Sequence, residues 1–140
     1  MRASNPPESK GVYVIRVKGK GKPVKQVIED AMECIRQLNW PLVGKKMSDR
    51  IERLQKVNVC SIIYIGSAGT GTESKHTLFG RYEDFAGRHT VMYPVWALLY
   101  SGWTLEYGWV QSRQPKVLEW QLKVKYKGLH DGELPALVRR

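Results

Sequence analysis

Cysteine is scarce in this chain of 140 residues, and its two copies, Cys34 and Cys60, form no C-x-x-C pair. Two isolated cysteines make neither a disulfide framework nor a zinc site, so we expect both to be reduced residues of the core. No apolar run reaches the roughly 18 residues of a membrane span, and no secretory apolar region follows the start MRASNPPESK. These absences predict an intracellular, cytoplasmic protein.

Several motifs of common enzymes are also missing. The glycine-rich stretch GSAGTG (66–71) resembles a phosphate-binding loop in composition, but Thr72 stands where that loop requires lysine. The chain contains no H-E-x-x-H zinc motif and no G-x-S-x-G nucleophile elbow. The sequence therefore predicts no nucleotide cofactor and disfavours zinc-dependent and serine hydrolase chemistry.

Acidic residues are the minority, with 13 Asp and Glu against 23 Lys and Arg and a net charge of +10. An excess of this size is an argument about partners, and polyanions are the first candidates. The basic residues are spread along the chain instead of being gathered on one amphipathic helix, which disfavours a membrane surface. DNA or RNA is therefore the expected partner.

Hydrophobic periodicity predicts a single domain over residues 1–140. Alternation and short apolar runs indicate strands at 11–17, 57–66 and 103–110. Helical spacing and capping residues indicate helices at 23–38, 47–56, 77–88, 93–101 and 114–128. Ser48 or Asp49 is the expected N-cap of the second helix and Thr77 that of the third, with Gly128 at the stop of the last. The order predicts an α/β (α+β) fold, a small sheet of about three strands flanked by helices, with a helical insertion at about 19–57.

The strand faces can be assigned as well. Alternation places Val12 and Val14 on one face of the first strand, and Tyr13, Ile15 and Val17 on the other. On the last strand the stripe that includes the tryptophans at 103 and 109 is either core or a base-stacking platform. No partner strand pattern suggests an open aromatic face, so we interpret it as core.

Two strands carry tyrosine-containing triplets, GVY (11–13) and YIG (64–66). Downstream, the segment LFGRYEDF carries Arg81 and the segment KVLEWQL carries Glu119. With the tail GELPALVRR, these motifs resemble the GIY-YIG nuclease family in the family's order, and the resemblance covers nearly the whole chain. It implies a restriction-type or stand-alone member with an insertion between the triplets, of prokaryotic or viral origin.

The resemblance implies a metal-dependent endonuclease that hydrolyses phosphodiester bonds in double-stranded DNA. In that family's terms Tyr13 is the general base or water-positioner and Tyr64 its hydrogen-bonding partner. Arg81 binds the scissile phosphate, and Glu119 holds Mg²⁺ or Mn²⁺. The triplet glycines Gly11 and Gly66 are structural, His89 is a further candidate for the site, and the expected DNA contacts are Lys18, Lys20, Lys22, Lys75 and Arg88.

These residue types suit the chemistry on independent grounds. Phosphodiester hydrolysis needs an activated water, neutralised charge at phosphorus and help for the leaving oxygen. A guanidinium matches phosphate oxygens, and one carboxylate leaves Mg²⁺ free to take waters and substrate oxygens. A phenol, whose pKa is about 10, is a poor base unless cations or a metal-bound water lower that value.

Each candidate also has an ordinary structural interpretation. The two tyrosines could be plain strand aromatics. Arg81 could pair with Glu83 or Asp84, and Glu119 could pair with Lys116 or Lys123 of its own helix.

Two features depart from the family. Its triplets usually lie closer together than here, and Val138 stands about where the tail carries an asparagine; no asparagine follows Asn58. The alternatives are therefore a catalytically impaired GIY-YIG-like DNA-binding protein or an RNA-binding domain. The inserted helices are expected to grip DNA or to form a homodimer, which is one way for a small nuclease to cut both strands.

Overall fold

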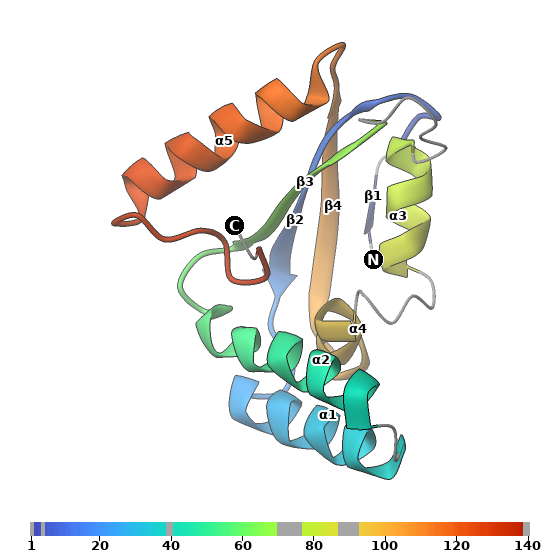
Figure 1. Ribbon diagram of the computed structural model, residues 1–140, viewed down its shortest axis with the longest axis vertical. Coiled ribbons are helices and arrows are strands. Elements are labelled where there is room, and N and C mark those ends of the chain that lie inside the picture. The colour runs from blue at the N-terminus through green and yellow to red at the C-terminus, as the bar shows by residue number, and fades with distance from the viewer. Residues whose placement is uncertain (1, 4, 39–40, 70–76, 87–92, 139–140) are drawn as a thin grey trace.

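A computed structural model describes residues 2–3, 5–38, 41–69, 77–86 and 93–138 of the chain. Its elements in chain order are β1 (Arg2–Ala3), β2 (Gly11–Gly19), α1 (Val24–Leu38), α2 (Pro41–Glu52), the 3₁₀ helix η1 (Arg53–Lys56), β3 (Ile62–Ala68), α3 (Leu78–Ala86), α4 (Tyr93–Tyr100), β4 (Thr104–Gln111) and α5 (Pro115–Leu129) (Figure 1).

The sheet has the order β1-β4-β2-β3, and β2 pairs antiparallel with both β3 and β4. Helix α5 lies on one side of the sheet and α3 on the other, while α1, α2 and α4 gather at one end (Figure 1). The predicted mixed fold with a small three-stranded sheet is confirmed. The fourth strand, β1, pairs parallel with β4 and was not predicted, because two residues carry no periodic signal.

Strand β2 separates two cores, as its alternation predicts. Tyr13 and Ile15 belong to the larger core, which the helices α1 to α4 help to build, and Val17 packs against it. Val12 belongs to a smaller core beneath α5, where Val14 packs beside it. The core interpretation of the aromatic stripe on β4 is also confirmed, since Trp103, Leu105 and Tyr107 are buried and Trp109 packs against them.

The second predicted strand is wrong at its beginning. Residues 53–56 form η1, 57–61 form a turn and bend, and β3 begins only at Ile62. Val57 is buried in the core from this turn, so the apolar run reflects packing and not an extended strand. The end of the strand differs as well: β3 continues to Ala68, so Gly66 lies inside the strand instead of at its end.

The second helix is longer than predicted. It begins at Pro41, a residue that suits the first turn of a helix, so Ser48 and Asp49 lie inside α2 and are not its N-cap. Its buried residues Met47 and Ile51 belong to the same core as α1. The buried stripe therefore holds the helix, and the polar residues that suggested a cap lie beside that stripe.

Two predicted helix boundaries are close to the structure. The amide of Gly80 donates to Thr77 Oγ1 at 3.0 Å, so Thr77 caps α3 as expected. Helix α5 begins at Pro115 as predicted but ends at Leu129, so Gly128 belongs to its last turn and is not the stop.

Both cysteines are free, as predicted, but Cys34 is exposed and Cys60 only half-buried. The buried stripe of α1 consists of Val27, Ala31 and Ile35, which leaves Cys34 at its edge. The prediction that both are core residues is therefore wrong. Within the described ranges, no helix is both long and apolar enough to cross a membrane.

Candidate active site

Three tyrosines from three neighbouring strands form a stack in the larger core. The Tyr13 and Tyr64 ring centroids are 5.9 Å apart with planes 12° from parallel, and those of Tyr13 and Tyr107 are 5.2 Å apart at 20°. Tyr13, on the central strand β2, is only 3% exposed. The two triplet tyrosines therefore face each other directly.

The glycines of the two triplets leave the space for this arrangement. A Cβ placed on Gly66 would lie 2.5 Å from the hydroxyl oxygen of Tyr13 and 2.8 Å from Cε1 of Tyr64. A Cβ on Gly11 would lie 2.1 Å from the carbonyl oxygen of Val110 on β4. A real Cβ essentially never lies this close to another heavy atom, so both positions favour glycine for steric reasons.

The start of helix α3, which carries Arg81, is fixed to the sheet. The amides of Leu78 and Phe79 donate to carbonyls of segment 7–9 at 2.8 and 2.9 Å. The hydroxyl of Tyr107 donates to the carbonyl of Leu78 at 2.8 Å in a buried bond. The last member of the tyrosine stack thus sets the position of the helix that presents Arg81.

Burial raises the pKa of Tyr13 well above its usual value, and the neighbouring Tyr64 raises it further, while Arg81 opposes the shift. The interaction between the two hydroxyls raises the pKa of Tyr13 and lowers that of Tyr64. The Tyr13 phenol is therefore neutral at neutral pH.

The pKa of Tyr64 responds to three other predicted site residues, Tyr13, Arg81 and Glu119. Burial raises its pKa, the Tyr13 hydrogen bond and Arg81 lower it, Glu119 raises it and Arg50 lowers it. Charges perturb a pKa in this way only from close by, because solvent screens distant ones. Of the four predicted residues, Tyr13 and Tyr64 stack directly, and the charges of Arg81 and Glu119 both act on the pKa of Tyr64.

Glu119 also fulfils its ordinary structural interpretation. Its side chain is 13% exposed, and its Oε2 lies 3.4 Å from Lys123 Nζ and 3.9 Å from Lys116 Nζ. Both lysines approach the same oxygen, so Oε1 is the atom that a metal ion would take. Within the described residues, no group of three or more His, Cys, Asp or Glu side chains could hold a metal. A cation at Glu119 would therefore depend on water and substrate oxygens, as Mg²⁺ often does.

Arg50 was not predicted as a site residue. It lies on α2, half-buried, one helical turn from the buried Met47 and from Leu54, so it projects from the side of the helix that faces the core. Its charge lowers the pKa of Tyr64, so α2 contributes to the electrostatics of the tyrosine stack. The only sequence signal was its spacing, because an arginine three residues after one buried position and four before another is placed beside the core.

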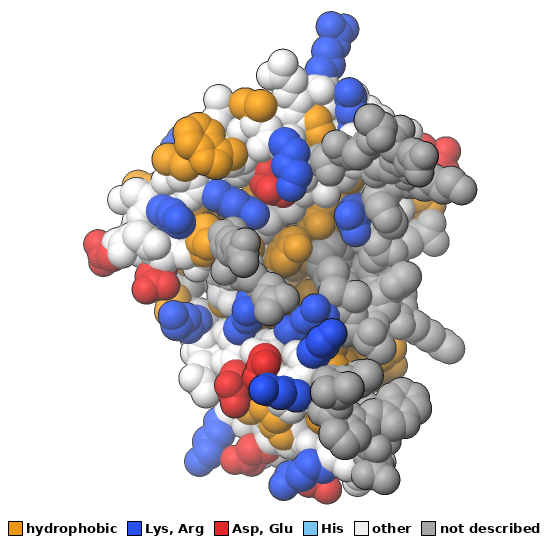
Figure 2. Space-filling model, in the orientation of Figure 1, with side chains coloured by type: hydrophobic (Ala, Val, Ile, Leu, Met, Phe, Trp, Pro, Cys, Tyr) orange, Lys and Arg blue, Asp and Glu red, His pale blue; other side chains and the backbone are white. Residues whose placement is uncertain are grey.

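The predicted DNA-binding residues do not gather at the tyrosines. Lys18 lies 3.9 Å from Glu106 and Lys22 lies 3.4 Å from Asp30, each as an ion pair near the far end of β2. Lys18 follows Tyr13 by five positions along the strand, a span of about 16 Å. Figure 2 shows Lys and Arg side chains spread over the described part of this face, from α5 to the helices at the end of the sheet.

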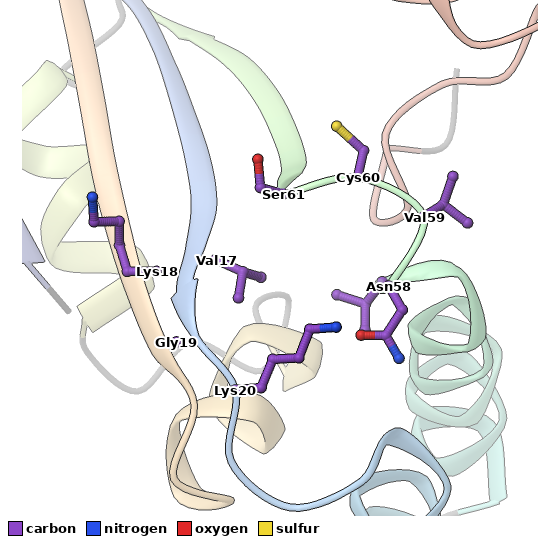
Figure 3. Close-up of a pocket in the computed structure, with 9 residues that line it drawn as sticks. Val17, Lys18, Gly19, Lys20, Asn58, Val59, Cys60 and Ser61 are labelled. Carbon is purple, nitrogen blue, oxygen red and sulfur yellow. The ribbon is translucent and has the colours of Figure 1, made fainter.

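Lys20 is exposed and lines a pocket of about 430 Å³ between the end of β2 and the loop at 57–61 (Figure 3). Lys75, Arg88 and His89 lie outside the described residues, as do the side chains of Glu83 and Asp84.

Val138 is half-buried near α2. It lines a pocket of about 520 Å³ together with Asp49 and Arg53, and the neighbouring Leu137 donates its amide to the carbonyl of Ile63 on β3 at 2.9 Å. The tail is therefore held against the strand that carries Tyr64.

Comparisons with protein-family models, curated proteins and solved structures find no match for this chain. The GIY-YIG resemblance thus depends on the sequence motifs alone and stays a prediction.

Proposed function

We propose that this chain is a metal-dependent endonuclease that hydrolyses phosphodiester bonds in double-stranded DNA, with Tyr13, Tyr64, Arg81 and Glu119 as its site. The observation that supports it most is the direct stacking of Tyr13 on Tyr64, together with the influence of Arg81 and Glu119 on the pKa of Tyr64. The net charge of +10 favours a polyanionic substrate. No membrane partner and no nucleotide cofactor form part of the proposal.

The geometry favours one of the two roles that the sequence left open for Tyr13. A buried phenol whose pKa is raised stays protonated at neutral pH, so Tyr13 orients groups by hydrogen bonding and does not act as a general base. A hydrogen bond donated by Tyr13 to the Tyr64 oxygen would leave the Tyr64 hydroxyl hydrogen for an attacking water or a phosphate oxygen. Arg81 and Arg50 would neutralise charge on the phosphate.

A divalent cation, when bound at Glu119, would act as a Lewis acid on the phosphodiester. The carboxylate, whose side chain is 13% exposed, is a hard oxygen ligand, which suits Mg²⁺ or Mn²⁺. Lys116 and Lys123 hold the carboxylate in place through Oε2.

A second function has specific support. Glu119 is paired with two lysines, and Val138 provides no amide where the family's tail has one. Both features favour a catalytically impaired DNA-binding relative, which would bind duplex DNA without cutting it.

The decisive experiment incubates the protein with supercoiled plasmid and Mg²⁺ or Mn²⁺, with a chelator lane. Glu119→Gln keeps the size of the side chain and removes its charge. We expect it to reduce cleavage by about 100-fold or more, because a transition-state contact is lost. The matched control is Glu33→Gln on α1, an exposed carboxylate paired with Arg36, which should cleave like the wild type.

Binding is measured in parallel on duplex DNA and on RNA of the same length. Binding driven by phosphate contacts should weaken with salt, with a log-log slope of about −0.9 per neutralised phosphate. Duplex binding without cleavage supports the impaired relative, and preference for RNA supports the RNA-binding alternative. Cleavage that survives both the chelator and Glu119→Gln contradicts the proposed site.

A further inference from the structure

A second cluster of reactive groups lies under the C-terminal end of α5, on the other side of the sheet from the tyrosine stack. Cys60 precedes β3 and packs against the small core that contains Tyr126. The rings of Tyr126 and His130 are stacked, with centroids 3.7 Å apart and planes 8° from parallel. A thiol, a phenol and an imidazole thus meet at one place that the proposed nuclease site does not use.

A hydrogen bond to the backbone defines which ring nitrogen of His130 carries a hydrogen. His130 Nδ1 lies 2.8 Å from the carbonyl oxygen of Tyr126. A carbonyl can only accept, so Nδ1 carries a hydrogen and Nε2 is the nitrogen that can take a proton. Cys60 packs against the small core of Tyr126, and Tyr126 stacks on His130. Both side chains act on the thiol and lower its pKa.

The charged and polar groups around the thiol favour its ionised form. Burial opposes ionisation, but the backbone amide of Ile62, the Tyr126 hydroxyl and His130 together lower the pKa of Cys60. Burial and the contact with Cys60 raise the pKa of Tyr126 to about 12, so this phenol keeps its hydrogen and can donate it in a hydrogen bond. The carbonyl of Tyr126, then Cys60 and Asp131, raise the pKa of His130.

The loop at 57–61 leaves Cys60 within reach of small molecules. Cys60 is half-buried and lines the pocket of Figure 3. In Figure 3 its thiol points away from the amino group of Lys20, which therefore takes no part in the cluster.

We propose that Cys60 is a nucleophilic thiol, activated by His130 and Tyr126, that forms mixed disulfides with small organic disulfides. The thiol proton passes to Nε2 of His130, and the thiolate attacks one sulfur of the disulfide. A new bond forms between Cys60 Sγ and that sulfur, the old sulfur–sulfur bond breaks, and the second half leaves as a thiolate. The disulfide is the oxidant and is reduced as Cys60 is oxidised.

The test uses the wild-type protein and a limiting amount of neutral dipyridyl disulfide, a probe that a basic surface does not attract. Cys34 is the internal control, because it is exposed, whereas Cys60 is half-buried. Mass spectrometry of the peptides measures which cysteine reacts. At neutral pH we expect Cys60 to react about threefold faster than Cys34, since more of it is thiolate although a less basic thiolate is a weaker nucleophile.

The preference should reverse in alkali. When both thiols are ionised, the half-buried and less basic Cys60 should react more slowly than Cys34. His130→Gln and Tyr126→Phe, checked for folding by circular dichroism, should slow Cys60 at neutral pH and leave Cys34 unchanged. Faster reaction of Cys34 at neutral pH, or a Cys60 rate that neither variant alters, would overturn the proposal. None of these results depends on nuclease activity.

Discussion

Gly66 provides a sharp test of the site's geometry. In most strands, replacing glycine by alanine stabilises the fold by about 0.4–1 kcal/mol, because the unfolded chain loses conformational freedom. At Gly66 the new Cβ would lie 2.5 Å from the Tyr13 hydroxyl oxygen and 2.6 Å from its Cζ. Tyr13 cannot move aside without leaving Tyr64 or Tyr107, since it lies between them.

The magnitude follows from these opposing effects. Overpacking in a filled core costs about 1–3 kcal/mol, and a disturbed aromatic pair adds about 0.5–1.5 kcal/mol. After the gain from the unfolded state is subtracted, we expect Gly66→Ala to lower the free energy of unfolding by about 1–3 kcal/mol. Gly128→Ala is the matched control, because a Cβ there meets nothing within 4 Å. It should raise the free energy of unfolding by about 0.5–1 kcal/mol, as is usual for helices.

Urea denaturation of both variants, followed by circular dichroism, measures the two effects with opposite signs. The midpoints should separate by about 0.5 M or more, for a denaturant slope of about 1–3 kcal/mol per molar. If Gly66→Ala is as stable as Gly128→Ala, the close approach of Tyr13 to the YIG triplet is refuted.

Two further predictions concern the charges around Tyr64. Arg50→Gln should reduce plasmid cleavage by about tenfold, the value of one charge-assisted contact. Lys45→Gln, which removes an exposed charge from the same helix, should have little effect. Equal losses in the two variants would show that only the net charge of the protein matters. Tyr13 and Tyr64 have raised pKa values when folded, so the unfolded chain loses these protons first, near pH 10. Stability should be unaffected below that pH and should fall as the pH rises above it. Urea midpoints from about pH 8 to 11 should show a smaller loss in Tyr13→Phe than in the wild type, and an identical loss would contradict the burial of this phenol.

The hydrophobic periodicity of the sequence was sufficient to predict a strand's faces where each face packs against its own core. The alternation of GVYVIRV predicts both faces of β2, because each face meets a separate core. It failed at 57–61, where Val57 is buried from a turn. An apolar residue signals burial and says little about backbone conformation when the run is short. Cys34 misled for the opposite reason, since a cysteine at the edge of a helical stripe can be exposed.

The candidate site was only partly predictable. The tyrosines could be placed by strand alternation, and Arg81 by its helix after the strand. Arg50 could not, because its position depends on how the insertion folds back against the sheet, which is a long-range property. The partnership of Tyr107 with the carbonyl of Leu78 is of the same kind, since nothing local in either segment indicates the other.

The attachment of Leu137 to Ile63 has a consequence for how this molecule meets its neighbours. Strand β3 ends the sheet order, and such a strand offers unpaired backbone groups to other chains. The amide of Leu137 donates a hydrogen bond to one of these groups, the carbonyl of Ile63, at 2.9 Å, and the Leu137 side chain is buried in the larger core. The segment therefore blocks the addition of a strand from another chain at this position of the β3 edge.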